Sequence, residues 1–414
     1  MRRPLDGIRI LELSTFVAAP VTGRLLSDLG ASVIKIEPPQ GDTWRLTGVS
    51  YVPTHFSADE NPVFDIYNAG KKMISLNLKT EDGKRAFHRL LQESDVFLTN
   101  TREAALKRLG ISYDDLRKDY PTLIYAQVTG FGPKGPDAEV PAFDTTAFWS
   151  RTGFMHDMAV VQDDGSYVPV YPPSGVGDSV TSYILIIQVL AALMDREKTG
   201  KGQRVESSLY HTGIFTMGTM QIQTQRPFGR KYPYKRMYHS LPGGYYQCKD
   251  GEYLFIATGM VQKLMDQMSR AIGRPELASD PRYSTPAARN EHREELYNIF
   301  KEAFLQKTVD EWLAIAKEMD FAAVKYKSFA DISEDEQALA NGYLEDVTFR
   351  TGRTEKMPRA PFHMESIPES EFVTVPAPLC GADTDEVLSS IGYSQEEIRK
   401  MKENGAAYSP SKDN

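Results

Sequence analysis

The chain has 414 residues, of which 41% are hydrophobic and 25% are charged, and its formal net charge is −8. This length exceeds what one compact domain usually holds, so two structural units are expected. The acidic balance, without a long basic block, argues against nucleic acid or an anionic membrane as the main partner. The N-terminus has no signal-peptide pattern and the longest apolar stretch, 183–194, is too short to span a bilayer, so we expect a cytoplasmic protein.

Strand-like and helix-like patterns alternate over the first 130 residues. Strands are predicted at 8–13, 32–37, 73–78, 95–100 and 123–130, with helices from Pro20, over 81–93 and, as two short helices, over 101–118. Strands separated by helix-length segments predict a parallel sheet with crossover helices. A loop rich in glycine and proline, 130–144, then leads to a long apolar helix after Asp178 and a strand-like segment at 204–210.

The pattern changes near residue 220. Residues 222–244 are irregular, basic and aromatic, which is typical of a crossing between domains. A hairpin is predicted over 244–257, with Asp250 and Gly251 at its turn. Helical segments fill 260–318, and a proline-rich stretch leads to a closing helix at 394–404.

The first strand-to-helix turn lacks the fingerprint of a dinucleotide-binding protein. That fingerprint, G-x-G-x-x-G, should occupy the turn, which instead reads LELSTFVAAPVTGRLL with one glycine. A parallel sheet alone does not define a function. The two cysteines and seven histidines show no metal-ligand spacing, so we expect no metal site and no permanently bound cofactor.

An acidic residue stands at the start of the long apolar helix. The segment GVGDSVT places Asp178 among small residues, directly before SYILIIQVLAALM. Aspartate is favoured at helix N-caps, so a purely structural role is one interpretation. The other is a catalytic role, which rests on the resemblance described next.

Motifs from one end of the chain to the other carry a family resemblance. They include PLDGIRILELSTFVAAPVTGRLLSDLGASVIKIEPPQGDTWR, NAGKKMISLNLKTEDGK, YAQVTGFGPKGP, LAALMDREKTGKGQRVESSL and PAPLCGADTDEVLSSIGYSQEEI. Together they resemble the class III CoA-transferases, the family of the formyl-CoA and carnitine CoA-transferases. The segments ENPVFDIYNAGKKMISLNLK and PAFDTTAFWSRTG are most similar to the branch acting on 2-hydroxyacyl and 2-enoyl groups, including the phenyllactate and 2-hydroxyisocaproate CoA-transferases.

The resemblance implies a fold, an assembly and a pair of substrates. The fold is α/β, with a large Rossmann-like CoA-binding domain built from 1–220 and 331–414 and a smaller domain with its linker over 221–330. Two chains form an interlocked homodimer. The substrates are an acyl-CoA and a free carboxylic acid, for this branch an (R)-2-hydroxy acid, and coenzyme A is a substrate rather than a resident cofactor.

The resemblance also implies roles for individual residues. Asp178 matches the family's nucleophile, which forms a mixed anhydride and then an aspartyl-CoA thioester. Asp144 matches an acidic position near it, and its other interpretation is a structural hydrogen bond to backbone amides. The positions that match the family's CoA contacts are Val17, Ala18, Lys71, Lys72, Asn100, Arg102, Ala105 and Arg108.

Three features leave the details of recognition open. Pro38 stands where some relatives have an arginine that contacts adenosine, so Arg45 or the pair Lys71 and Lys72 would have to substitute. Gly243 and Gly244 match either a glycine lid or the entry to a hairpin. The aromatic residues that could line an acyl pocket or belong to the core are Phe143, Phe148, Trp149 and Phe154.

Other functions also fit this family. Racemases of 2-methylacyl-CoA share the fold and need an acid/base pair at the α-carbon, for which His156 is the nearest candidate in sequence. A CoA-binding protein without catalysis would fit an Asp178 that only caps its helix. A transferase specific for formyl, succinyl or carnitine groups is a further alternative.

Overall fold

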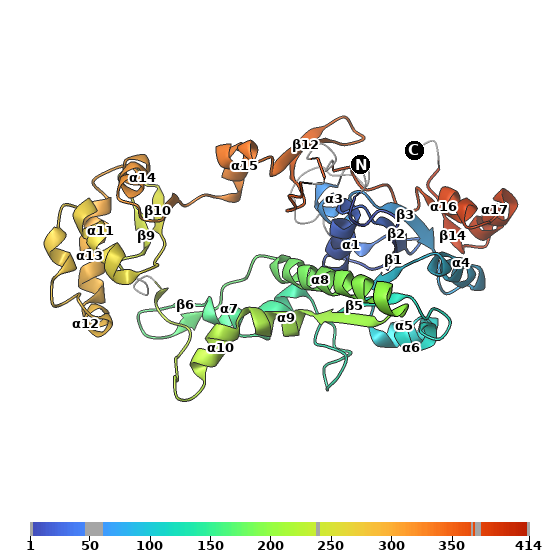
Figure 1. Ribbon diagram of the computed structural model, residues 1–414, viewed down its shortest axis with the longest axis horizontal. Helices are drawn as coiled ribbons and strands as arrows, with labels where there is room; N and C mark the ends of the chain where they lie inside the picture. The colour runs from blue at the N-terminus through green and yellow to red at the C-terminus, as the bar shows by residue number, and fades with distance from the viewer. Residues whose placement is uncertain (1–2, 46–60, 237–240, 366, 369–373, 412–414) are drawn as a thin grey trace. The chain divides into compact units, whose positions relative to one another are not determined.

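The structure, a computed structural model, describes residues 3–45, 61–236, 241–365, 367–368 and 374–411. The chain divides into two compact units. The first comprises 1–157, 170–230 and 336–414, and the second comprises 158–169 and 231–335. Figure 1 labels the elements of both units along the chain.

A seven-stranded sheet lies at the centre of the first unit, as far as the described residues show. Its order is β14-β3-β2-β1-β4-β5-β8. The neighbours pair in parallel, except that β14 runs antiparallel to β3. The strands are β1 (Arg9–Leu13), β2 (Ser32–Glu37), β3 (Lys72–Leu76), β4 (Val96–Thr99), β5 (Ile124–Thr129), β8 (Arg204–Ser208) and β14 (Ala407–Tyr408). The predicted parallel sheet with crossover helices is therefore confirmed.

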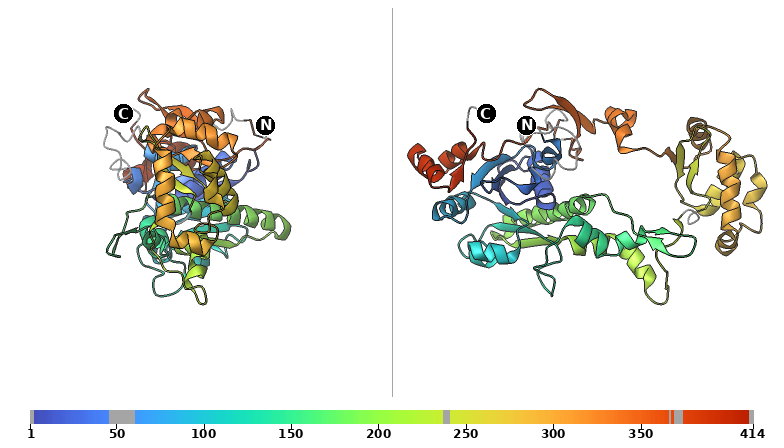
Figure 2. Two further views of the ribbon diagram at one scale, coloured as in Figure 1. Left: turned by 90° about the vertical axis from the view of Figure 1, so that its left-hand side faces the viewer. Right: turned by 180° about the vertical axis from the view of Figure 1, so that it is seen from behind.

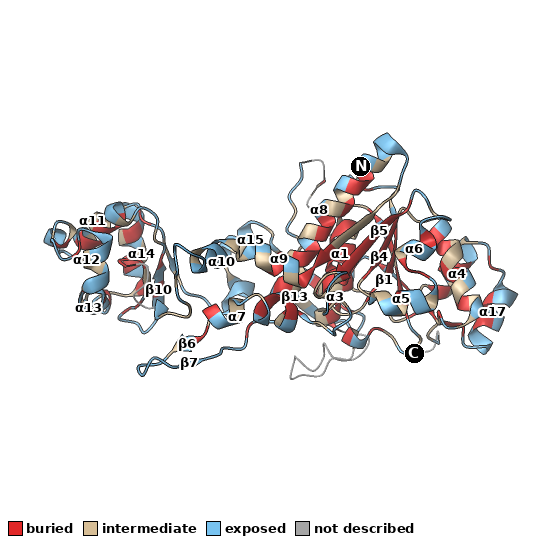
Figure 3. Cartoon of the chain, turned by 90° about the horizontal axis from the view of Figure 1, so that it is seen from below, coloured by how far each residue is buried: buried red, intermediate tan, exposed pale blue. Residues whose placement is uncertain are grey.

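Helices cover both faces of this sheet (Figures 1 and 2). Along β1, Ile10 joins one core cluster and Leu11 the other, because successive side chains of a strand point to opposite faces. Both faces are covered, which explains why the central strands are buried in Figure 3. One face packs against α1 (Ala18–Asp28), α3 (Pro62–Asn68) and α8 (Val176–Thr199), the other against α4 (Glu81–Gln92), α5 (Glu103–Leu109), α6 (Tyr113–Leu116), α16 (Thr384–Ser390) and α17 (Gln395–Glu403).

Three element boundaries differ from the sequence expectation. Helix α1 starts at Ala18, two residues before Pro20, and the proline is tolerated because N–H groups of the first turn have no partner inside the helix. Helix α8 starts at Val176, before Asp178. Strand β8 ends at Ser208, whose side chain accepts a hydrogen bond from the N–H of His211 and so begins α9 (Leu209–Thr216).

The remaining elements of the first unit are short. They are η1 (Asp144–Ser150), α7 (Phe154–Asp157), α10 (Gly218–Thr224), α15 (Glu336–Ala340) and the antiparallel pair β12 (Leu344–Thr348) and β13 (Thr354–Pro358). The π-helical turn η1 carries Asp144 and packs against α8 and α9.

The second unit has its own core. The predicted hairpin is confirmed as β9 (Gly244–Gln247) and β10 (Tyr253–Ile256), with Gly251 at a φ of 83° in the turn. Strand β11 (Ala323–Lys325) extends it, and Tyr246, Phe304 and Trp312 are buried beneath. The other elements are β6 (Val160–Val161), β7 (Tyr167–Val168), α11 (Val261–Ala271), η3 (Pro275–Ala278), α12 (Pro286–Glu291), α13 (Arg293–Phe304), α14 (Val309–Glu318) and η4 (Phe329–Glu334).

Helix α8 is long and apolar enough to cross a membrane by length and composition alone. One such helix is weak support for a membrane protein, because the core helix of a soluble protein passes the same test. One side of α8, including Leu185 and Val189, is buried in the core against α1 and the sheet.

Candidate active site

A cavity of about 580 Å³ opens beside the carboxyl ends of β1, β4 and β5. The segments that follow these strands, 15–18, 100–103 and 130–133, supply much of its wall. The order of the sheet reverses between β1 and β4, so the connections leave in opposite directions and a crevice remains at this edge. The topology of the sheet therefore positions the cavity.

Asp178 lines this cavity from the first turn of α8. The N-cap of the helix is Gly175, with a φ of 87°, and Asp178 is the third helical residue. The N-cap is a glycine without a side chain, and Asp178 lies inside the first turn rather than at the N-cap. A side chain at Gly177 would lie 2.2 Å from Cγ of Phe148 and 2.3 Å from Oδ1 of Asp144, which explains the glycine there.

Asp144 lies next to the start of the same helix. Its Oδ2 accepts hydrogen bonds from the N–H of Gly175 (2.8 Å) and from Nε1 of Trp149 (3.2 Å). Its Oδ1 accepts from the N–H of Asp178 (3.2 Å). Asp144 therefore makes the hydrogen bonds to backbone amides that its structural interpretation expects, and these bonds also bring it beside Asp178.

Burial and a neighbouring charge govern the electrostatics of this carboxylate pair. Burial raises the pKa of Asp178 to about 7, and the negative charge of Asp144 adds to the rise. Burial also raises the pKa of Asp144, against the hydrogen bonds that stabilise its ionised form. The helix N-terminus favours an ionised Asp178, but the environment as a whole leaves this carboxyl group titrating near neutral pH.

The structure brings six of the predicted site residues to this cavity. They are Val17, Ala18, Asn100, Arg102, Ala105 and Asp178. The amide of Asn100 donates to the carbonyl of Thr15 (2.7 Å) and accepts from its N–H (3.0 Å). Asn100 thereby ties together the two loops that follow β1 and β4.

Three predicted CoA contacts lie elsewhere in the described structure. Lys71, Lys72 and Arg108 are not among the described residues that line the cavity. Lys71 is 3% exposed, and its ammonium lies 2.8 Å from Oε2 of Glu12, so this charge is already paired inside the protein. Lys72 is paired with Glu386 on the surface at 2.6 Å.

Two further candidates also lie outside the described lining of the cavity. Arg45 forms an ion pair with Glu37 at 2.7 Å, so its guanidinium is engaged within the protein. His156 belongs to α7 and is likewise not among the described cavity residues. Gly244 opens strand β9 of the second unit, which fits the entry to a hairpin.

Several cavity residues had not been assigned a role from the sequence. Phe16 has a φ of 63°, and its ring meets that of Phe143 edge to face, with centroids 5.2 Å apart. The aromatic residues Phe148 and Trp149 are instead buried. Lys107, one helical turn after Glu103, adds a cation on α5 that amphipathic spacing could have revealed. Arg204 comes from β8, and no local pattern links it to this site.

This arrangement suits attack by a carboxylate on a thioester. The N-termini of α1 and α8 meet here, and the hydroxyl of Ser182 donates to the carbonyl of Ala18. N–H groups at a helix start can stabilise the oxyanion of a tetrahedral intermediate, and because Asp144 accepts those of Gly175 and Asp178, the start of α1 is the candidate for this role. In the part of the chain that the structure describes, no group of three His, Cys, Asp or Glu residues could hold a metal ion.

Comparison with known proteins identifies the family. Residues 5–384 match the family model for CoA-transferase family III. The chain is 39% identical to the (R)-2-hydroxy-4-methylpentanoate CoA-transferase of Clostridioides difficile, over 96% of this chain and 98% of the relative. It is 36% identical to the cinnamoyl-CoA:phenyllactate CoA-transferase of Clostridium sporogenes, over 96% and 95%. The crystal structure of a CAIB/BAIF family protein from Brucella suis is similar, with a TM-score of 0.79 and 27% identity over 94% of this chain and 100% of that one. The chain therefore belongs to CoA-transferase family III and is a CoA-transferase.

Proposed function

We propose that the protein transfers CoA reversibly between an acyl-CoA and a free (R)-2-hydroxy acid, with Asp178 as the nucleophile. The observation that carries this proposal is the carboxyl group of Asp178, which lines the cavity and does not cap its helix. Two similar proteins named for 2-hydroxy acids support the substrate class.

The chemistry proceeds through two covalent intermediates. The ionised carboxylate of Asp178 attacks the carbonyl of the acyl-CoA and expels CoA thiolate, which leaves a mixed anhydride. The thiolate then attacks the aspartyl carbonyl of the anhydride and releases the first acid as its carboxylate. The resulting aspartyl-CoA thioester reacts with the acceptor carboxylate by the same two steps in reverse, which regenerates Asp178.

The walls of the cavity fit the two ends of such a substrate. Arg102 and Lys107 present exposed cations from the loop after β4 and from α5, where they suit the phosphates of CoA. Phe16 and Phe143 present apolar rings within the same cavity as Asp178. We assign the aromatic pair to the acyl side chain, which would favour branched or aromatic acids over formate or oxalate.

A soluble, cytoplasmic, interlocked homodimer is part of the proposal. Tyr183, Ile187 and Met194 form an apolar stripe along α8, with Ile187 61% and Met194 62% exposed. Their spacing of four and seven residues puts them on one side of the helix, opposite the face buried in the core. An exposed apolar stripe of this kind is typical of a protein–protein interface, and a second copy of the chain would bury it.

A trapping experiment tests the chemistry. The protein is incubated with cinnamoyl-CoA without an acceptor acid, and then treated with hydroxylamine or with borohydride before peptide mapping by mass spectrometry. We expect an acyl-CoA-dependent modification at Asp178 that is missing from the Asp178→Asn variant. An unmodified Asp178 peptide, together with cinnamoyl-CoA that stays intact after addition of a panel of acids, would refute the proposal. Exchange of the α-proton without release of CoA would indicate a racemase instead.

A further inference from the structure

The loop between β1 and α1 holds a residue in an unfavourable backbone conformation. Phe16 has a φ of 63°, and among the described residues only Asp320 is another non-glycine residue with positive φ. The left-handed region is disfavoured for a bulky side chain, so it persists only where the surroundings impose it. Phe16 lines the same cavity as Asp178, so this conformation bears on the proposed active site.

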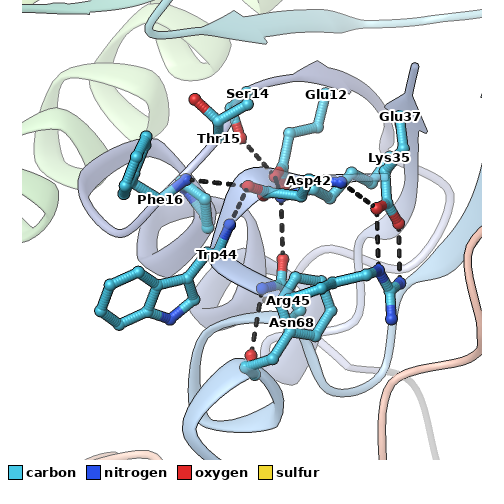
Figure 4. A network of polar contacts seen from close by, with 12 residues as sticks. Glu12, Ser14, Thr15, Phe16, Lys35, Glu37, Asp42, Trp44, Arg45 and Asn68 are labelled. Atoms are coloured by element: carbon cyan, nitrogen blue, oxygen red, sulfur yellow. Dashed lines mark hydrogen bonds and ion pairs between the residues drawn. The ribbon is translucent and has the colours of Figure 1, made fainter. Parts of the chain in front are cut away.

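The side chain of Asp42 accepts a hydrogen bond from the backbone of Phe16. Its Oδ1 accepts hydrogen bonds from the N–H of Phe16 (3.3 Å) and from the N–H of Trp44 (2.9 Å) (Figure 4). The rings of Phe16 and Trp44 lie 6.0 Å apart between centroids. Asp42 thus holds both the amide of Phe16 and the aromatic residue beside it.

A buried network of charges holds Asp42 in turn. Its Oδ2 accepts a hydrogen bond from Nζ of Lys35 (2.7 Å), and its own N–H donates to Oε2 of Glu37 (2.7 Å) (Figure 4). Burial opposes the charge of Lys35, but Asp42 and Glu12 outweigh it and raise the pKa of this lysine. Both Asp42 and Lys35 are almost completely inaccessible to solvent. A buried charge without its partner is strongly unfavourable, so the ion pair with Lys35 holds the side chain of Asp42 in place.

The same network reaches the cavity loop at a second point. The hydroxyl of Ser14 donates to Oε1 of Glu12 (Figure 4). The carboxylate of Glu12 pairs with Lys71 at 2.8 Å and lies 3.5 Å from Lys35. The loop is therefore anchored before Phe16 through Glu12 and at Phe16 through Asp42. The family resemblance matched Lys71 to a nucleotide contact. In the structure Lys71 is buried and belongs to this network through its ion pair with Glu12.

We propose that Asp42 is a positioning residue that holds Phe16 in its left-handed conformation and so sets the aromatic wall beside Asp178. With Asp42 in place, the ring of Phe16 meets that of Phe143 at 5.2 Å within the cavity. Without the acceptor at Oδ1, the backbone of Phe16 relaxes to negative φ and the ring leaves this wall. The assignment of the wall to the acyl group rests on the proposed function, but the link from Asp42 to Phe16 does not.

A double-mutant cycle separates this role from a merely structural one. We would combine Asp42→Ala with Phe16→Gly, because glycine adopts positive φ readily and removes the ring. The measured quantities are kcat/KM for CoA transfer and the dissociation constants of cinnamoyl-CoA and acetyl-CoA. The binding measurements use the Asp178→Asn background so that no transfer occurs.

In the native Phe16 background we expect Asp42→Ala to weaken the preference for cinnamoyl-CoA over acetyl-CoA about tenfold, the scale set by releasing one strained residue. In the Phe16→Gly background the same change should alter this preference less than about twofold. Equal losses in both backgrounds would overturn the proposal, because they would mean that Asp42 acts only on overall stability. A preference that does not change in either background would overturn it as well.

Two controls complete the design. Asp65 is another buried carboxylate of the first unit, accepts a hydrogen bond from the N–H of Ala377 and is not among the described cavity residues. Asp65→Asn should therefore show no coupling to Phe16→Gly. If Asp42→Ala does not fold, Asp42→Leu fills a similar space, also removes the Oδ1 acceptor, and serves in the same cycle. A protein that binds acyl-CoA with the expected coupling but transfers no CoA would refute the proposed function and leave the role of Asp42 standing.

Discussion

The pH dependence of transfer is the sharpest consequence of the carboxylate pair. The pKa of Asp178 rises from an ordinary value of 3.8 to about 7, so this residue is protonated and unreactive below neutral pH. The rate of the first acyl transfer should therefore increase with pH through a midpoint near 7. The change Asp144→Asn removes the neighbouring negative charge and should lower that midpoint.

The size of the change follows from the causes of the rise. Burial is the larger cause and Asp144 the smaller, so Asp144 accounts for less than half of the rise. We expect the midpoint to fall by about one pH unit, which corresponds to about 1.4 kcal/mol. The substitution also exchanges one acceptor oxygen for an amide that faces N–H donors, so the maximal rate and the stability will fall too. The midpoint is the informative quantity because it does not depend on the maximal rate.

The assay is kcat/KM for cinnamoyl-CoA between pH 5 and pH 9, at constant ionic strength and with saturating acceptor acid. Circular dichroism at each pH establishes that wild type and Asp144→Asn are folded over the range compared. A wild-type midpoint near pH 4, or a midpoint that is unchanged or higher in Asp144→Asn, would refute the reasoning. The first result would mean that burial does not govern Asp178, and the second that Asp144 does not act through its charge.

Three further predictions concern stability and assembly. Folded Asp178 holds its proton up to about pH 7 while the unfolded chain releases it near 4, so this group's contribution to stability is lost as pH rises. In urea unfolding, the free energy of unfolding of Asp178→Asn should gain about 2.6 kcal/mol on that of wild type between pH 5 and pH 8, and a constant difference would contradict this. Gly177→Ala should lower the stability of the fold by about 1–3 kcal/mol, because the new methyl group clashes with Phe148. Gly218→Ala has open space around the new methyl group and should leave the stability nearly unchanged in thermal unfolding. Equal effects of the two substitutions would rule out the clash as the cause. Ile187→Lys should lower the melting temperature of the dimer without splitting it, because interlocked chains separate only on unfolding, and an unchanged melting temperature would remove the α8 stripe from the interface.

Local pattern predicted much of the fold. The segments 32–37 and 95–100, predicted as strands, contain β2 and β4 in the structure, and most of their residues are buried because both faces of the sheet are covered. The boundaries were less predictable at α1 and α8, where the helices begin two residues before Pro20 and Asp178. A helix start depends on which neighbour satisfies its N–H groups, and at α8 that neighbour is Asp144, more than thirty residues earlier.

The site divides in the same way. The sequence by itself determined the family, through motifs spread along the whole chain, and it singled out Asp178 at the start of an apolar helix. Only the tertiary structure decided that Lys71 is buried against Glu12, that Asp42 accepts a hydrogen bond from the N–H of Phe16, and that Arg204 joins the cavity. The pairing of a charge and the strain of a backbone depend on partners that are distant in the chain. The spacing of residues along the sequence does not reveal such contacts, because only the folded sheet brings the partners together.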